Sequence, residues 1–185
     1  MTEPECVPWK VACSRYLFRE PWLTVRKDSL ELPNGANVPS YYVLEYPEWV
    51  NTIAITPEGQ WVMVYQYRHG LGRAAYELSA GLIEPDDPSL LDGARRELLE
   101  ETGYGGGEWT HYMTVSANPA THSNLTHTFL ARGVVPVAEP RLDRTEVLQA
   151  VLLTPAEVKG LLDRNQIVQA LMAAPMWRYF AENPL

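Results

Sequence analysis

Three glutamates near the end of one predicted helix, Glu97, Glu100 and Glu101, have the chemistry and the spacing of a metal site. At about 100° per residue, they fall within roughly 100° of arc on one helix face. Carboxylates this close repel one another, and the C-terminal end of a helix favours cations over anions. Hard divalent cations such as Mg²⁺ bind oxygen ligands and commonly use carboxylates together with substrate phosphates. The cluster therefore indicates a divalent-cation site, and a solvated acidic face balanced by Arg95 and Arg96 is the alternative.

The helix that carries these glutamates is predicted over residues 88–102. Its apolar side chains recur with the spacing of one helix face, at Leu91, Ala94 and Leu98. Asp87 followed by proline favours a helix start at that point, and Ser89 is an alternative N-cap. Gly103 is expected to end the helix, because glycine readily adopts the left-handed conformation of a C-terminal cap.

The first half of the chain is rich in Val, Ile, Tyr, Trp and Thr, which favour strands. The predicted strands cover residues 12–18, 22–32, 39–46, 50–56 and 60–68. The pair Asn34-Gly35 predicts a tight hairpin turn between two of them. Later strands are predicted at 108–118, 125–133 and 146–153, and later helices at 154–163 and 165–180. We therefore expect an α/β (α+β) protein, with a small N-terminal antiparallel β-sheet over residues 1–47 and a larger mixed domain over residues 48–185.

The composition argues against several classes of partner. Among 185 residues, 15 Lys and Arg stand against 23 Asp and Glu, which gives a formal net charge of −8. A chain this acidic is not expected to present the basic face that binds nucleic acid or an anionic membrane. No stretch approaches the ~20 apolar residues of a transmembrane helix, MTEPEC does not resemble a signal peptide, and Cys6 and Cys13 are the only cysteines. We expect a cytoplasmic protein with no nucleic-acid or membrane partner.

Residues 77–104 resemble the Nudix box, the signature of the Nudix hydrolase family. That signature reads Gly, five residues, Glu, seven residues, then Arg-Glu-apolar-any-Glu-Glu-any-Gly-apolar. The whole second half, which begins at Arg96, matches at every specified position. The first half differs, because 14 residues separate Gly81 from Arg96 where the signature has 13, and the nearest acid to the expected glutamate is Asp86 or Asp87. The difference concerns a supporting loop contact more than the metal ligands.

The resemblance implies a Nudix fold, an α/β/α sandwich with a mixed sheet. It also implies a reaction that depends on Mg²⁺, with Mn²⁺ or another divalent cation as a substitute. The metal ligands implied are the carboxylates of Glu97, Glu100 and Glu101 and the backbone carbonyl of Ala80. Glu100 and Glu101 are then also catalytic residues. The residues with supporting roles are Gly81, Gly103 and Arg96, which pairs with a box glutamate and orients it.

Beyond the box, residues 10–175 resemble the branch of ADP-ribose pyrophosphatases and nucleoside-diphosphate-sugar hydrolases. The strand end Tyr65-Gln66-Tyr67-Arg68 and the segment 77–81 carry this likeness, although Ser79 stands where the branch has proline. The resemblance implies that Arg68 and Glu77 bind substrate. It also implies a homodimer in which the N-terminal strands help to complete the partner's substrate site. The alternatives are an ordinary surface arginine for Arg68 and a strand-end ion pair for Glu77.

Glu146 aligns with the loop glutamate that serves as general base in this branch. Such a base must reach the attacking water directly, and a mobile loop brings it there when substrate is bound. A solvated loop acid beside Asp143 and Arg144 is the alternative reading of Glu146.

The expected function is hydrolysis of the pyrophosphate bond of a nucleoside diphosphate sugar, with ADP-ribose yielding AMP and ribose 5-phosphate. GDP-mannose or another nucleoside diphosphate derivative is an alternative substrate. A catalytically silent Nudix-fold module that senses a nucleotide is a second alternative, and an acidic structural helix in an unrelated β-rich protein is a third.

Overall fold

The computed structural model describes residues 5–20 and 23–185 of the chain. Contacts within the chain divide it into two compact units. Unit 1 contains the residues up to Tyr46 together with Asn118–Asn124, and unit 2 contains Pro47–Ala117 and Leu125–Leu185. The loop 118–124 therefore belongs with the N-terminal segment, although the two lie far apart in sequence.

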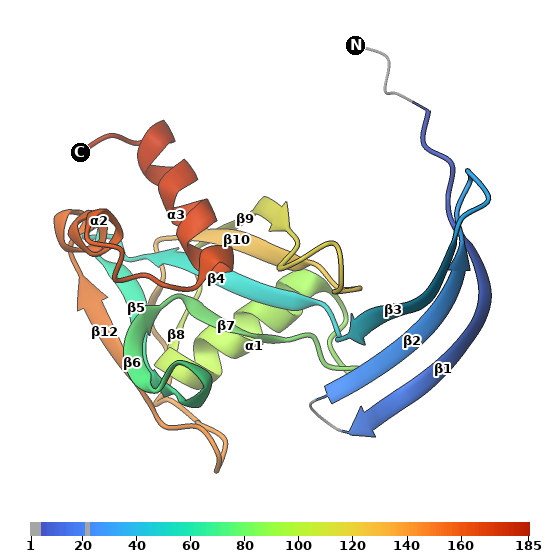
Figure 1. The fold of residues 1–185 in the computed structure, drawn as a ribbon. Helices are drawn as coiled ribbons and strands as arrows, with labels where there is room; N and C mark the ends of the chain where they lie inside the picture. Colours follow the sequence, from blue (N-terminus) through green and yellow to red (C-terminus); the bar gives the residue numbers. More distant parts are fainter. Residues whose placement is uncertain (1–4, 21–22) are drawn as a thin grey trace. The chain divides into compact units, whose positions relative to one another are not determined.

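Unit 1 is built, in its described residues, on a three-stranded antiparallel sheet in the order β1-β2-β3 (Figure 1). The strands are β1 (Lys10–Glu20), β2 (Leu23–Glu31) and β3 (Asn37–Glu45). The turn predicted at Asn34-Gly35 joins β2 to β3, and Gly35 has a φ of 81°, which glycine adopts most readily. The strands predicted at 12–18, 22–32 and 39–46 are confirmed, except that Trp22 lies outside the described residues.

Unit 2 contains a seven-stranded mixed sheet whose main path runs β12-β5-β4-β10-β9. Its strands are β4 (Trp49–Ile55), β5 (Trp61–Arg68), β6 (Arg73–Glu77), β7 (Ser79–Leu82), β9 (Glu108–Val115), β10 (Thr126–Arg132) and β12 (Leu148–Leu153). β4 and β10 run parallel, and the other pairs are antiparallel. A separate small sheet pairs β8 (Tyr104–Gly105) with β11 (Val135–Pro136). The strands predicted in this unit are confirmed, with small shifts at their ends.

The main sheet divides next to β4. β4 and β5 pair only at Ala54–Val62 and Ile55–Trp61, and beyond that point they part. β6 and β7 fill the gap, since β6 pairs with β5 and β7 pairs with β4. The residue pattern predicts no strand at β6, because two alanines in five residues favour strands weakly. Pairing with β5 forms this strand instead.

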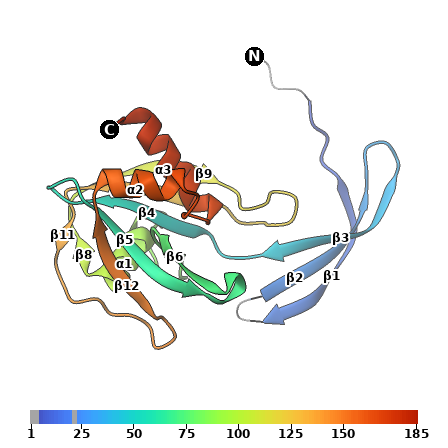
Figure 2. The ribbon, with the colours of Figure 1, turned by 60° about the vertical axis from the view of Figure 1, so that its left-hand side comes forward.

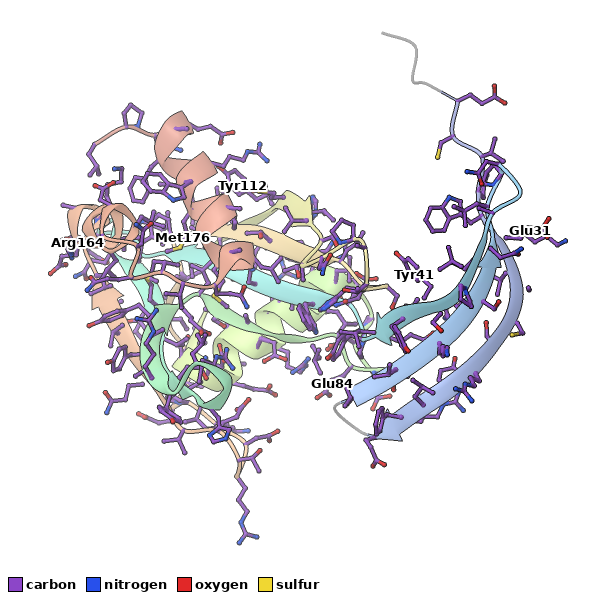
Figure 3. The ribbon with its side chains drawn as sticks, in the orientation of Figure 1. Glu31, Tyr41, Glu84, Tyr112, Arg164 and Met176 are labelled. Carbon is purple, nitrogen blue, oxygen red and sulfur yellow. The ribbon has the colours of Figure 1, made fainter. Side chains whose placement is uncertain are left out.

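Helices cover both faces of the main sheet, which confirms the predicted α/β/α sandwich (Figures 1 and 2). In the described part of unit 2 they are α1 (Leu90–Thr102), α2 (Pro155–Asp163) and α3 (Ala170–Glu182). Alternate residues of β4 face opposite layers. Ala54 packs with Leu98 of α1, whereas Ile53 packs with Met176, which points from α3 toward the sheet (Figure 3). No helix among the described residues is long and apolar enough to cross a bilayer.

The helix ends follow local capping rules. Ser89 is the N-cap of α1, and its hydroxyl accepts the backbone N–H of Asp92 at 3.2 Å. The start predicted at Asp87 is wrong and the alternative at Ser89 is confirmed, because the Asp87 carboxylate is used by Arg96 and by the backbone of the preceding loop. Gly103 ends α1 as predicted, with a φ of 74°. α2 begins with a capping box between Thr154 and Glu157.

α3 begins at Ala170, later than the predicted start at 165. Asn165 has a φ of 53°, which lies outside the helical region and delays the helix. Pro175 lies inside α3 and has no N–H to donate to the carbonyl of Leu171, four residues earlier. The side chain of Asn51 in β4 replaces that donor, because its Nδ2 donates to Leu171 O at 3.1 Å. A buried amide therefore joins the first turn of α3 to the central strand of the sheet.

Candidate active site

Arg96 lies at the centre of a network of acids on α1 and the loop before it. Its Nε and Nη2 donate to the two carboxylate oxygens of Asp87 at 3.0 and 2.9 Å. Its Nη1 donates to Glu97 at 2.9 Å and to Glu100 at 3.0 Å, and Nη2 also reaches the carbonyl of Leu82 at 3.0 Å. The guanidinium holds the pKa of Asp87 below its ordinary value, mainly through these hydrogen bonds. One cation thus fixes the orientation of two of the three carboxylates that are predicted metal ligands.

Gly81 in β7 lies directly against the Glu97 side chain of α1. A Cβ atom at Gly81 would lie 2.1 Å from the carboxyl carbon of Glu97. No side chain fits there while Glu97 keeps its position. Glycine is therefore required because the Glu97 carboxylate lies so close to the backbone, and not because of the φ angle of residue 81. The supporting role expected for Gly81 has this physical basis.

Glu101 is buried between α1 and β7, with 4% of its surface exposed. Its Oε2 accepts the backbone N–H of Ala80 at 3.1 Å. Burial raises the pKa of Glu101 to about 8, an effect that contacts with Ser79 and Ala80 only partly offset. Burial likewise raises the pKa of Glu97 to about 7, against the opposing influence of Arg96. Both carboxylates therefore lie where a negative charge is poorly compensated by the protein.

The donors of this site fit a hard divalent cation. The predicted ligands offer only oxygen, which is what Mg²⁺ and Mn²⁺ bind, and an added cation would relieve the uncompensated charge of Glu97 and Glu101. Within the described residues, no three acidic, histidine or cysteine side chains are placed so that together they could hold a metal ion. Glu97 and Glu100 are instead bound to Arg96, while Glu101 is bound to the backbone of Ala80. The ligand roles of these residues and of the Ala80 carbonyl remain predictions.

Glu146 lies on the exposed loop before β12, close enough to influence the acids of α1. Its charge contributes to the raised pKa of Glu97 and of Glu101, and to the raised pKa of Arg68. The Glu146 carboxylate accepts the backbone N–H of Asp143 at 3.1 Å, so the loop itself holds the side chain. The tertiary structure thus brings Glu146 near α1, and its role as general base remains a prediction.

Arg68 and Glu77 form an ion pair at the end of β5 and β6. Glu77 is 3% exposed, and both of its oxygens accept hydrogen bonds from Arg68. Gln66 donates to the same carboxylate at 3.1 Å. Hydrogen bonding to Glu77 raises the pKa of Arg68. The buried carboxylate thus positions a guanidinium whose side chain is 44% exposed, and the substrate contacts predicted for the pair remain predictions.

A cavity of about 570 Å³ lies beside these residues within unit 2. The predicted residues in its wall are Arg68, Glu77, Ala80 and Gly81. Much of the remaining wall is apolar and comes from β4, from the turn after β5, from the end of β7 and from the start of α3: Trp49, Val50, Asn51, Leu71, Leu82, Val168, Gln169, Leu171 and Met172. This size suits a small organic ligand. Because Ala80 and Gly81 touch Glu101 and Glu97, the cavity adjoins the acidic face of α1.

Sequence reasoning did not identify Asn51 or Gln66 as residues of the site. The signal for Asn51 is an amide side chain inside the buried stretch VNTIAI of β4, where Thr52 is the other polar residue. The partner that holds it comes from α3, and the sequence alone does not show which segments meet. The sequence shows Gln66 only as part of a strand end, because its contact with Glu77 depends on the register between β5 and β6.

Comparison with known proteins defines the class. Residues 46–173 match the model of the NUDIX domain, and residues 9–44 match the nucleoside diphosphate sugar hydrolase N-terminal domain. The chain therefore belongs to the Nudix family and is a Nudix hydrolase.

The relatives of the chain indicate its branch within the family. It is 29% identical to an ADP-ribose pyrophosphatase of Bacillus subtilis, over 89% of this chain and 88% of that protein. It is 32% identical to an ADP-ribose pyrophosphatase of Mycobacterium tuberculosis, over 81% of this chain and 72% of the relative. It is 30% identical to a methanol dehydrogenase activator of Bacillus methanolicus, over 85% of each chain. The fold also matches a crystal structure of an ADP compounds hydrolase with a TM-score of 0.80 and 23% identity, over 98% of this chain and 99% of the other.

Proposed function

We propose that the protein hydrolyses the pyrophosphate bond of a nucleoside diphosphate sugar with Mg²⁺, and that ADP-ribose is cleaved to AMP and ribose 5-phosphate. The observation that carries this proposal is the junction at Ala80 and Gly81. These two residues line the cavity and also contact Glu101 and Glu97, so a ligand in the cavity places its phosphates beside the carboxylates. The names of two relatives, both ADP-ribose pyrophosphatases, support the choice of substrate.

The metal ligands and Arg96 have different roles in the proposed hydrolysis. A divalent cation held by Glu97, Glu100, Glu101 and the Ala80 carbonyl supplies charge stabilisation at the pyrophosphate and an activated water. Arg96 keeps Glu97 and Glu100 oriented, as residues that bond to ligands commonly do. These contacts come from the chain itself and exist before substrate binds.

Glu146 and Arg68 act directly on the reactants in this proposal. Glu146 accepts the proton of the attacking water, and its loop must bring the carboxylate to that water when substrate is present. Arg68, held by the buried Glu77, binds a phosphate of the substrate. Both roles require that the two side chains lie near the same end of the cavity, and the contribution of the Glu146 charge to the raised pKa of Arg68 supports that placement.

The experiment that tests the function is a substrate panel. ADP-ribose, ADP-glucose, GDP-mannose, diadenosine diphosphate and NADH are incubated with the protein and Mg²⁺, and the products are separated by chromatography. We expect ADP-ribose to be cleaved with the highest kcat/KM and to yield AMP. Glu101→Gln, which removes a charge but keeps the shape, is the matched inactive control. Cleavage of GDP-mannose in preference to ADP-ribose would reassign the substrate, and cleavage of none would leave a nucleotide-sensing module.

We also propose that the protein is a homodimer, with residues 1–47 serving dimerisation and the substrate site and residues 48–185 serving catalysis. The support comes from β1, an edge strand whose residues are all exposed. Its exposed side chains include the apolar Val11, Leu17 and Phe18. An apolar edge strand is a ready template for pairing with another chain. Light scattering that gives the mass of a monomer would contradict the proposal.

We place the enzyme in the cytoplasm. Cys6 and Cys13 are both free and exposed, and free thiols of this kind fit a reducing compartment. Fractionation of cells that produce the protein, with immunodetection in each fraction, tests this placement.

A further inference from the structure

Residues 78–81 alternate between the two faces of the main sheet. Leu78 and Ala80 pack into the core that includes α3. Successive side chains of a strand point to opposite faces, so Ser79 and Gly81 face α1. The closeness of Gly81 to the Glu97 carboxylate agrees with this direction. Ser79 therefore presents a hydroxyl to the acidic helix, where Gly81 has no side chain to present.

The spacing along β7 matches the spacing along α1. Two residues of a strand span about 7 Å, and four residues of a helix span about 6 Å. Gly81 lies against Glu97, so Ser79, two residues earlier, faces Glu101, four residues later. The pKa of Glu101 reflects this contact, because burial is the largest influence and raises it, and the Ser79 hydroxyl is the next and lowers it. The hydroxyl and the carboxylate are therefore neighbours.

The Ser79 hydroxyl is buried without a hydrogen bond. Ser79 is 1% exposed, and its Oγ has no partner with hydrogen-bond geometry among the described residues. Buried hydroxyls are normally paired. A hydroxyl hydrogen rotates to suit its acceptor, so a small movement of either side chain completes a bond from Ser79 to Glu101. The serine is thus a donor in reserve beside a predicted metal ligand.

One hydrogen bond already holds Glu101. Its Oε2 accepts the backbone N–H of Ala80 at 3.1 Å. A single bond leaves the carboxylate able to turn about its last side-chain torsion, which has broad minima in glutamate. A second donor from Ser79 fixes the plane of the carboxylate and leaves its other lone pairs for a cation. Hydrogen bonds that orient a ligating carboxylate in this way raise metal affinity.

We propose that Ser79 is a positioning residue of the metal site, and that its hydroxyl donates to the Glu101 carboxylate when that carboxylate binds a divalent cation. The inference rests on the proposed function, which makes Glu101 a metal ligand. It adds that β7 supplies two donors to one ligand, the N–H of Ala80 and the hydroxyl of Ser79. In this arrangement Ser79 acts through Glu101 and does not contact the cation.

Ser79→Ala tests the hydroxyl. Isothermal titration calorimetry of the full chain with Mn²⁺ at pH 7 measures metal affinity without substrate or turnover. We expect Ser79→Ala to bind Mn²⁺ at least about tenfold more weakly than the wild type, and Ser79→Thr, which keeps the hydroxyl, to stay within about threefold. Equal affinities of Ser79→Ala and the wild type overturn the inference. An equal loss in a Ser79→Thr protein that has the Tm of the wild type also overturns it.

Thermal stability in EDTA at pH 7 separates positioning from packing. Because the hydroxyl is unpaired, its removal breaks no hydrogen bond, and Ser79→Ala should have a Tm equal to or above that of the wild type. Thr128→Val in β10 is the matched control, since it removes another buried and unpaired hydroxyl and should leave the Mn²⁺ affinity unchanged. A lower Tm of Ser79→Ala in EDTA, or an equal loss of Mn²⁺ affinity in Thr128→Val, overturns the inference.

Turnover assays with ADP-ribose and Mg²⁺ distinguish this inference from the proposed function. Weaker Mn²⁺ binding by Ser79→Ala, with no cleavage of any panel member by the wild type, supports the role of Ser79 and refutes the hydrolase proposal for these substrates. Cleavage by the wild type, with equal Mn²⁺ affinities of the two proteins, does the reverse. A wild-type protein that binds no Mn²⁺ overturns both.

Discussion

Arg96 and Asp87 form a bidentate ion pair, in which Nε and Nη2 of Arg96 donate to the two carboxylate oxygens of Asp87 at 3.0 and 2.9 Å. Asp87 stands in a loop with one residue more than the Nudix signature, at the place where no glutamate matches. Its Oδ2 also accepts the backbone N–H of Glu84 at 2.9 Å, which holds the loop. The irregular first half of the box thus retains an acid that orients Arg96.

Asp87→Asn tests this contact. The change removes the charge that pairs with Arg96 and one of its two acceptors, so Arg96 should hold Glu97 and Glu100 less firmly. We expect activity or metal affinity to fall about 10- to 100-fold, the usual cost of losing a partner that orients a ligand. Asp86→Asn is the matched control, because Asp86 is the exposed neighbouring acid. Equal losses in the two variants would show that the loop charge matters and the contact with Arg96 does not.

Gly81→Ala should separate activity from stability. The added Cβ would lie 2.1 Å from the Glu97 carboxyl carbon, so the carboxylate must move away. Because this group is the flexible end of a long side chain, the backbone of α1 and β7 can stay in place. We expect a loss of kcat of about 100-fold or more, with a change in the free energy of unfolding of only about 1 kcal/mol. Steady-state kinetics and urea titration measure the two effects. Gly160→Ala in α2 is the control, since the atoms nearest to its added Cβ belong to the Arg164 guanidinium. Full activity in Gly81→Ala would show that the close approach of Gly81 to Glu97 is not needed.

Stability in EDTA should decrease as the pH rises from about 4.5 to about 8. Burial raises the pKa of Glu97 to about 7 and that of Glu101 to about 8, above their ordinary value of 4.5. The folded state therefore holds protons that the unfolded state has already released, and folding loses free energy as these carboxyls ionise. Asp28 and Asp87 have lowered pKa values, so the stability that their ionised carboxylates contribute is lost only in more acidic solution.

Mg²⁺ should raise the Tm more at pH 8 than at pH 6, because it binds the ionised carboxylates. Thermal unfolding at several pH values, with EDTA or Mg²⁺, measures both effects. Glu101→Gln should flatten the pH dependence in EDTA and weaken the response to Mg²⁺. A Tm in EDTA that increases steadily up to pH 8 would contradict the burial of these charges.

Glu146→Gln tests the general base. The variant keeps an acceptor for the backbone N–H of Asp143 but cannot take a proton from water. We expect kcat to fall by 10²- to 10⁴-fold, the range of general-base catalysis, while KM changes little. Asp143→Asn retains the backbone contacts of the loop and should stay within about threefold of the wild-type kcat. A loss below about tenfold in Glu146→Gln would place the base elsewhere.

Local rules in the sequence account for much of the fold and for the acids of α1. The spacing of Glu97, Glu100 and Glu101 sets them on one helix face, because every residue of a helix turns by the same angle. Gly103 and Thr154 mark helix ends through hydrogen bonds made within a few residues. Strand propensity likewise located the long strands, although it missed β6, which depends on a neighbouring strand.

The tertiary structure decided which of these residues meet. Asp86 and Asp87 were the candidate acids for the first half of the box, and packing of the loop against the helix selected Asp87 as the partner of Arg96. The division of the sheet between β4 and β5, and the docking of α3 on Asn51, formed the cavity wall from segments more than 100 residues apart in the chain. The sequence by itself determined the chemistry available on one helix face, since that depends on local geometry. Only packing between distant segments, which no local spacing encodes, determined the cavity beside it and the contact between Ser79 and Glu101.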